Sequence, residues 1–135
     1  MQFDTKIAVI IRNDLETWQK LNVAAFTVSG IASIEGIIGE KYVDGSDRTY
    51  LPMIKQPILI FSTDQEQIRK VYDHALAADA QLSIYTEELF STPHDEANRA
   101  AVRACTSADL KLVGLAVRGR KKAMDKMLKG LSLHA

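Results

Sequence analysis

The sequence is poor in cysteine and has no long hydrophobic run. Cys105 is its only cysteine, which excludes an intramolecular disulfide and gives no sign of an oxidising compartment. No apolar stretch approaches the roughly 20 residues that a membrane-spanning helix requires. The N-terminal segment MQFDTK lacks the basic head and apolar run of a signal peptide. We therefore expect a cytoplasmic protein with no membrane partner.

The chain also lacks an excess of charge of either sign. Seventeen basic residues balance seventeen acidic ones, so the whole surface does not attract nucleic acid or membrane. Hydrophobic residues make up 47% and charged residues 25%, which is the balance of a soluble globular protein. A length of 135 residues suits one core, and we predict a single domain over residues 1–135.

The common cofactor and metal motifs are missing as well. His74, His94 and His134 have no metal-ligand spacing, and there is no Walker loop or dinucleotide glycine pattern. We expect no cofactor and no metal. Ser29 has no Gly-x-Ser-x-Gly context, so we interpret it as a small packing residue with its hydroxyl bonded to the preceding turn.

What the sequence does have is a regular alternation of apolar strands and amphipathic helices. Four strands are predicted, over residues 5–11, 57–62, 81–86 and 111–119. A helix is predicted after each of them, over residues 18–36, 63–79, 92–105 and 120–130. An Asp-Gly pair within residues 37–56 indicates a hairpin. This order predicts a three-layer α/β/α sandwich with a mostly parallel sheet.

Local signals give the expected helix starts and buried faces. Thr63, with Glu66 three residues later, has the signature of a capping box, and Thr92 is placed to cap the third helix. Helical spacing places Leu21 and Leu76 on the buried faces of their helices.

Polar residues follow the predicted strands, where α/β sheets collect their functional groups. We expect a binding site made of residues near these strand ends: Arg12, Asp14, Lys20, Asn22, Thr86 and Glu87.

Three of these candidates have a second interpretation. Asp14 either orients a substrate amine or a catalytic lysine, or it caps the turn and pairs with Arg12 or Lys20. Asn22 is either a ligand-binding amide or a polar residue of the first helical turn. Glu87 is either a general acid or base or part of a solvated turn.

Three stretches resemble the peptidyl-tRNA hydrolase II fold. VIIRNDL followed by VAAF is similar to a strand ending in Arg-x-Asp-Leu and a helix opening with Ala-Ala-Gln. PILIFSTDQEQIRKVYDHALAADAQLSIYT resembles its strand, helix and strand, and LVGLAVRGRKKAMDKMLKGL resembles its last strand and helix. The chain looks most like a bacterial family of uncharacterised proteins in that superfamily. The resemblance implies a four-stranded mixed sheet with strand four antiparallel, and a homodimer.

The chain also departs from the hydrolase pattern. Asn22 stands where the hydrolase has a lysine, Ser29 where it has a histidine, and Phe26 where it has a glutamine. The resemblance therefore implies a protein of unknown function, a non-canonical member that binds a small polar ligand or partner at the strand-one turn. The alternative is a divergent peptidyl-tRNA hydrolase, or another amide or ester hydrolase, with Asp14, Lys20 and Glu87 as catalytic candidates.

The C-terminal segment RGRKKAMDKMLKG holds six basic residues and one acid. One interpretation is contact with an RNA backbone through Arg118, Arg120, Lys121 and Lys122. No aromatic residue lies between these cations, so base stacking is not indicated. The other interpretation is an ordinary solvated helix face.

Overall fold

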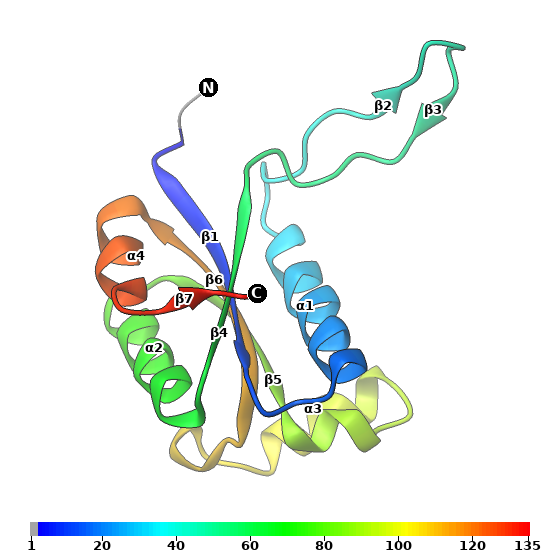
Figure 1. Ribbon diagram of the computed structural model, residues 1–135. Coiled ribbons are helices and arrows are strands. Elements are labelled where there is room, and N and C mark those ends of the chain that lie inside the picture. Colours follow the sequence, from blue (N-terminus) through cyan, green and yellow to red (C-terminus); the bar gives the residue numbers. More distant parts are fainter. Residues whose placement is uncertain (1–2) are drawn as a thin grey trace.

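A five-stranded mixed sheet forms the centre of the computed structural model, which describes residues 3–135 (Figure 1). The strand order is β5-β6-β1-β4-β7. The strands are β1 (Thr5–Arg12), β4 (Ile58–Thr63), β5 (Gln81–Thr86), β6 (Leu112–Arg120) and β7 (Ser132–Leu133). β1 and β4 are parallel, and β6 runs antiparallel to both of its neighbours, β1 and β5. The predicted α/β class is confirmed, but the expected mostly parallel sheet is wrong: of the strand pairs described in this sheet, β1–β4 is parallel and the other three are antiparallel.

The expected four-stranded layout is wrong, because β7 adds a fifth strand antiparallel to β4. Gly130 adopts a φ of 87° after the last helix, which turns the chain back toward the sheet. The N–H of His134 then donates to the carbonyl of Ile60 at 2.8 Å. A two-residue strand of this kind leaves no periodic pattern, so sequence periodicity could not reveal it.

Helices cover both faces of the sheet (Figure 1). α1 (Thr17–Ala32) packs on one face, while α2 (Gln65–Ala77) and α4 (Lys121–Leu128) pack on the other. The remaining helical segments are η1 (Glu87–Ser91), α3 (Asp95–Arg103) and η2 (Ser107–Asp109). Because both faces are covered, residues 7–11 of β1 and 112–117 of β6 are fully buried, as their continuous apolar runs predict.

α1 approaches the sheet closely through small residues. Gly114 of β6 lies beneath Val23, and a Cβ atom at Gly114 would come within 2.3 Å of Val23 Cγ1. The buried Thr27 hydroxyl donates to the Val23 carbonyl, and Ser83 Oγ of β5 donates to the Thr27 carbonyl at 2.6 Å. Gly30 of α1 also lies against β5, since a Cβ atom at Gly30 would come within 2.8 Å of Ser83 Cβ.

The predicted buried faces of α1 and α2 need correction. Leu21 and Leu76 are both more than half exposed. The residues of α1 that face the core are instead Val23, Thr27 and Ile31. α1 is apolar around much of its circumference, so spacing alone does not say which side meets the sheet.

Two helix caps differ from the prediction by one or two residues. Thr63 still pairs with β1 as the last residue of β4, so Asp64 caps α2 and accepts from the Gln67 N–H at 2.8 Å. Thr92 lies before the start of α3, and His94 takes its place as the cap. His94 Nδ1 accepts from the Ala97 N–H at 3.1 Å.

Residues 37–56 form the predicted hairpin, which we call the arm. Its strands β2 (Tyr42–Val43) and β3 (Thr49–Tyr50) are antiparallel. Asp44 accepts hydrogen bonds from the Ser46 and Arg48 N–H groups and from the Tyr50 hydroxyl. These bonds, that of Tyr50 first, lower the pKa of Asp44. The arm extends away from the sheet beyond the end of α1 (Figure 1).

We predict that Gly114→Ala lowers the free energy of unfolding by about 1–3 kcal/mol, because the new methyl would overlap Val23 and lie 3.1 Å from the Ile10 carbonyl oxygen. Urea denaturation measures the loss. Gly45→Ala in the arm is the matched control, since no atom lies within 4 Å of the added methyl. Equal effects in the two variants would contradict the packing argument.

Candidate functional site

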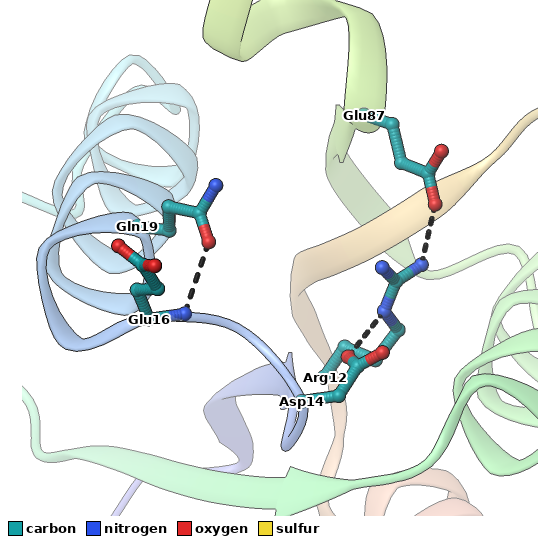
Figure 2. A network of polar contacts seen from close by, with 5 residues as sticks. All are labelled: Arg12, Asp14, Glu16, Gln19 and Glu87. Carbon is teal, nitrogen blue, oxygen red and sulfur yellow. Dashed lines mark hydrogen bonds and ion pairs between the residues drawn. The ribbon is translucent and has the colours of Figure 1, made fainter.

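Arg12 joins two carboxylates at the end of β1 (Figure 2). Its Nε lies 2.6 Å from Asp14 Oδ1, and its Nη1 lies 2.9 Å from Glu87 Oε1. The Arg12 side chain is only 12% exposed, whereas Asp14 and Glu87 are 63% and 44% exposed. Burial by itself lowers the pKa of Arg12, but the two carboxylates outweigh it and hold the pKa above its usual value. The guanidinium is therefore a permanent cation between two anions.

Backbone hydrogen bonds hold the neighbouring strand ends beside Arg12. The Asn13 N–H donates to the Thr63 carbonyl at 2.8 Å, which joins the ends of β1 and β4. The Glu87 N–H donates to the Lys111 carbonyl at 3.0 Å, which joins the end of β5 to the start of β6. Arg12, Asp14 and Glu87 thus meet at one edge of the sheet, as their positions after parallel strands suggested.

Asn22 lies apart from this network, in a groove of about 500 Å³. One wall of the groove comes from the outer face of α1, and the other from β5, η1 and the start of α3. The aromatic and polar lining of the groove includes Trp18, Phe26, Tyr85, Phe90, His94 and Asn98. The groove and the Arg12 network share the junction of β5 with η1, because Glu87 follows Tyr85 by two residues.

Four aromatic rings line the groove in contact with one another. Phe90 meets Trp18 edge to face, with ring centres 5.7 Å apart, and Tyr85, with ring centres 4.9 Å apart. The ring centres of Phe26 and Tyr85 are 6.2 Å apart. Trp18 and Phe26 are 51% and 59% exposed. Burial raises the pKa of Tyr85, so its hydroxyl stays protonated at neutral pH.

The start of α1 holds the Trp18 ring in position. The indole Nε1 donates to Glu16 Oε2 at 2.9 Å. Glu16 is itself held by its backbone N–H, which donates to Gln19 Oε1 at 2.9 Å (Figure 2). This local network keeps the indole at the edge of the groove.

Polar groups from η1 and α3 complete the lining. The Thr92 hydroxyl donates to Asn98 Oδ1, which leaves the Asn98 amide NH₂ as a donor. His94 Nδ1 accepts the capping bond, so in the neutral ring the proton resides on Nε2. Asp95, also in the lining, pairs with Arg99 one turn further along α3.

The other predicted site residues are dispersed. Lys20 is half-buried on α1 and pairs with no acid within residues 3–135. Thr86 is buried at the end of β5, and its hydroxyl has no hydrogen-bond partner in the described part of the chain. Ser29 Oγ donates to the Phe26 carbonyl at 2.5 Å, which is the predicted bond to the preceding turn.

Sequence reasoning missed the aromatic groove. A signal was present, since Trp18 and Phe26 lie eight residues apart on the helix face that carries Asn22 and Ser29. The same reasoning placed Leu21 on the buried face of α1 and did not group Trp18 with Phe26. Phe90 and Asn98 join the groove only because η1 and α3 fold back toward α1. The sequence has no local signal for this fold-back.

The basic C-terminal segment lies far from this edge. Arg118 and Arg120 pair in register with Ile7 and Thr5, near the amino end of β1. Arg118 donates to Gln81 Oε1 at 2.7 Å, while Lys121 and Lys122 are exposed at the start of α4. The cations do not contribute to the groove or to the Arg12 network.

Two further features are absent from residues 3–135: a metal-binding cluster and a membrane-spanning helix. No three His, Cys, Asp or Glu side chains gather in a way that could hold a metal ion. None of the helices in this range has the length and apolar character to cross a bilayer.

Comparisons with known proteins show close similarity but no established activity. The family model described as "Protein of unknown function (DUF2000)" matches residues 5–135. The chain is 50% identical to an Agrobacterium protein of solved structure, Atu0240 of strain C58, also described as of unknown function. The match covers 99% of this chain and 100% of that one, with a TM-score of 0.93. No curated protein matches the chain.

We predict that Arg12 and Glu87 stabilise each other by about 0.5–1 kcal/mol. A double-mutant cycle with Arg12→Gln and Glu87→Gln, followed by urea denaturation, measures this coupling. The coupling should fall at 1 M salt, because Glu87 is partly exposed to screening ions. Purely additive losses would show that the bond contributes nothing to stability.

We also predict that Thr86→Val raises the free energy of unfolding by about 1 kcal/mol, because it replaces a buried hydroxyl that lacks a partner with a methyl of the same shape. Thr27→Val is the matched control: the equally buried Thr27 hydroxyl donates at 2.7 Å, and its loss is expected to cost about 1 kcal/mol. Calorimetric unfolding of both variants checks the difference in sign. A clear decrease in the free energy of unfolding of Thr86→Val would show that the Thr86 hydroxyl does have a hydrogen-bond partner.

Proposed function

Because the chain belongs to the DUF2000 family of proteins of unknown function, we infer its activity from its own site and propose that it binds a small ligand in the aromatic groove. The ligand we propose is a planar, uncharged ring that carries hydrogen-bond acceptors. The observation that carries the proposal is the contact of four aromatic rings in a groove with polar side chains at its rim.

The aromatic walls support a planar ligand. Trp18 and Phe26 expose about half of their surface, although each is large and apolar. Contact with a flat molecule would remove this surface from water and add stacking or edge-to-face contacts, worth about 0.5–1.5 kcal/mol per ring pair. The bond from the indole to Glu16 holds Trp18 in place before binding, which lowers the entropic cost.

The polar groups of the groove favour hydrogen-bond acceptors on the ligand. His94 offers Nε2–H and Asn98 offers its amide NH₂, and both are donors. Asn22 adds an amide that bonds to no other side chain among residues 3–135. Asp95 is neutralised by Arg99, so the groove carries no unbalanced charge to attract an ion. Ring nitrogens and carbonyl oxygens are the matching acceptors.

The Arg12 network has a positioning role in this proposal. Arg12 connects the turn before α1 to the start of η1, and these two segments lead into opposite walls of the groove. The carboxylates of Asp14 and Glu87 both accept hydrogen bonds from Arg12, and neither forms an ion pair with Lys20. A nucleophile paired with a base is missing from this set, which supports binding rather than hydrolysis.

The resemblance to peptidyl-tRNA hydrolase II fits the same proposal. The Arg-x-Asp-Leu turn is retained as residues 12–15, whereas Asn22 and Ser29 stand at the positions of the hydrolase lysine and histidine. We therefore propose a member of that superfamily in which the strand-one turn supports a binding groove instead of a catalytic centre.

Trp18 makes the proposal testable without a label, since it is the only tryptophan of the chain. We predict that its fluorescence changes saturably with at least one member of a panel of nicotinamide, adenine, uracil, indole and flavin-type rings. Dissociation constants in roughly the micromolar to millimolar range are expected for ligands of this size. Thermal shift of Trp18→Phe controls for optical artefacts.

Groove variants identify where the ligand binds. Phe90→Ala and Asn98→Leu are expected to weaken binding about tenfold or more, whereas Leu76→Ala, an exposed apolar change on α2, leaves the affinity unchanged. Absence of binding across the panel, or equal affinity in all three variants, would contradict the proposal.

A further inference from the structure

The outer wall of the groove, made by η1 and α3, is weakly anchored to the rest of the molecule. None of the residues of Glu87–Ser91 or Asp95–Arg103 is buried. α3 packs mainly on η1, the segment that precedes it. Its nine residues are fewer than an isolated helix needs to be stable in water. The stability of α3 therefore depends strongly on the hydrogen bonds at its ends.

The cap at the start of α3 is an imidazole. His94 Nδ1 accepts from the Ala97 N–H at 3.1 Å, and the His94 carbonyl accepts from the Asn98 N–H at 3.1 Å. The first bond needs a lone pair on Nδ1, which only the neutral ring has. Protonation places an N–H on Nδ1, facing the N–H of Ala97, so the capping bond is lost. The new positive charge also lies at the positive end of the helix dipole, where a cation is unfavourable.

The other ionisable side chains around His94 are of types that keep their charge near neutral pH. On α3 itself, Asp95 forms an ion pair with Arg99, and Glu96 is exposed on the same turn. β5 contributes Tyr85, whose raised pKa keeps its hydroxyl protonated. Among the described residues that line the groove, those from α1 and η1 are uncharged. Of all these side-chain types, only imidazole changes its charge between about pH 5 and 8.

The first turn of α3 carries side chains of the groove with it. His94 and Asn98 both line the groove, at the end of the molecule where α1 begins (Figure 1). Loss of the capping bond frays this turn and moves both side chains out of the wall. Because η1 packs against α3, the contact of Phe90 with Trp18 loosens as well. Water then reaches more of the indole.

We propose that His94 is an acid-sensitive cap of the groove wall. Its neutral ring holds the first turn of α3 in place, and its protonated ring releases that turn. A ligand bound in the groove would leave on acidification, and this consequence rests on the proposed function. The movement of the wall does not depend on a ligand, so it is measured on the ligand-free protein.

Acrylamide quenching of Trp18 fluorescence between pH 8 and pH 5 tests the proposal. Loss of a cap changes the ratio of formed to frayed helix end about fivefold, so we expect the wild-type quenching constant to rise about 1.5- to 2-fold along one sigmoid as the pH falls. His94→Asn supplies a cap that has no proton to gain, and its quenching should stay at the pH 8 value. His74→Asn, at an exposed position of α2, is the matched control and should keep the wild-type response.

A second variant separates movement of the wall from direct quenching by the imidazolium. His94→Ala has neither cap nor charge, so at pH 8 it should already show the quenching of the acidic wild-type protein. His94 is exposed, so circular dichroism should show that both of its variants fold. Constant wild-type quenching over this pH range would overturn the proposal, and so would a pH response that persists in His94→Asn. Quenching of His94→Ala equal to that of the wild type at pH 8 would also overturn it, because the acid effect would then come from charge alone.

Discussion

The close contact of α1 with β6 is the constraint on which the rest of this structure depends. Gly114 has no side chain, so Val23 can lie directly over the centre of the sheet. Thr27 and Ile31 follow at helical spacing, and Ser83 bonds to the helix backbone from the neighbouring strand. This contact sets the rotation of α1 about its axis. The rotation then decides, for every other residue of α1, whether its side chain faces the sheet or faces away from it.

The aromatic groove follows from that rotation. Once Val23, Thr27 and Ile31 face the sheet, Trp18, Asn22 and Phe26 lie on the outer side of α1. Apolar side chains on an outer helix face are expensive to leave in water, and here η1 and α3 fold back to cover part of them. The coverage is incomplete, and what remains open is the groove. The groove has thus formed from the part of α1 that the core does not use.

Arg12 connects this groove to the sheet. One carboxylate partner, Asp14, follows β1 directly, and the other, Glu87, lies after β5 and 75 residues from Arg12 in sequence. A buried guanidinium needs such partners, because an unpaired buried charge is costly. The Arg-x-Asp turn therefore has a structural role in this chain, which is to pair the buried guanidinium. The arm lies at the opposite end of the sheet, where Gln56 at its base donates to the Thr5 carbonyl at 3.0 Å.

The sequence by itself determined the alternation of strands and helices, the hairpin at Asp44 and Gly45, and the strand ends where Arg12, Asp14 and Glu87 lie. These features depend on local periodicity and turn chemistry, which each segment carries independently of the others. Only the tertiary structure decided which side of α1 is buried, that β7 joins the sheet, and that Phe90 and Asn98 lie opposite Trp18. Those outcomes depend on contacts between segments that are distant in sequence. The energy of these contacts exceeds the local propensities for helix and strand, and no single stretch of sequence encodes it.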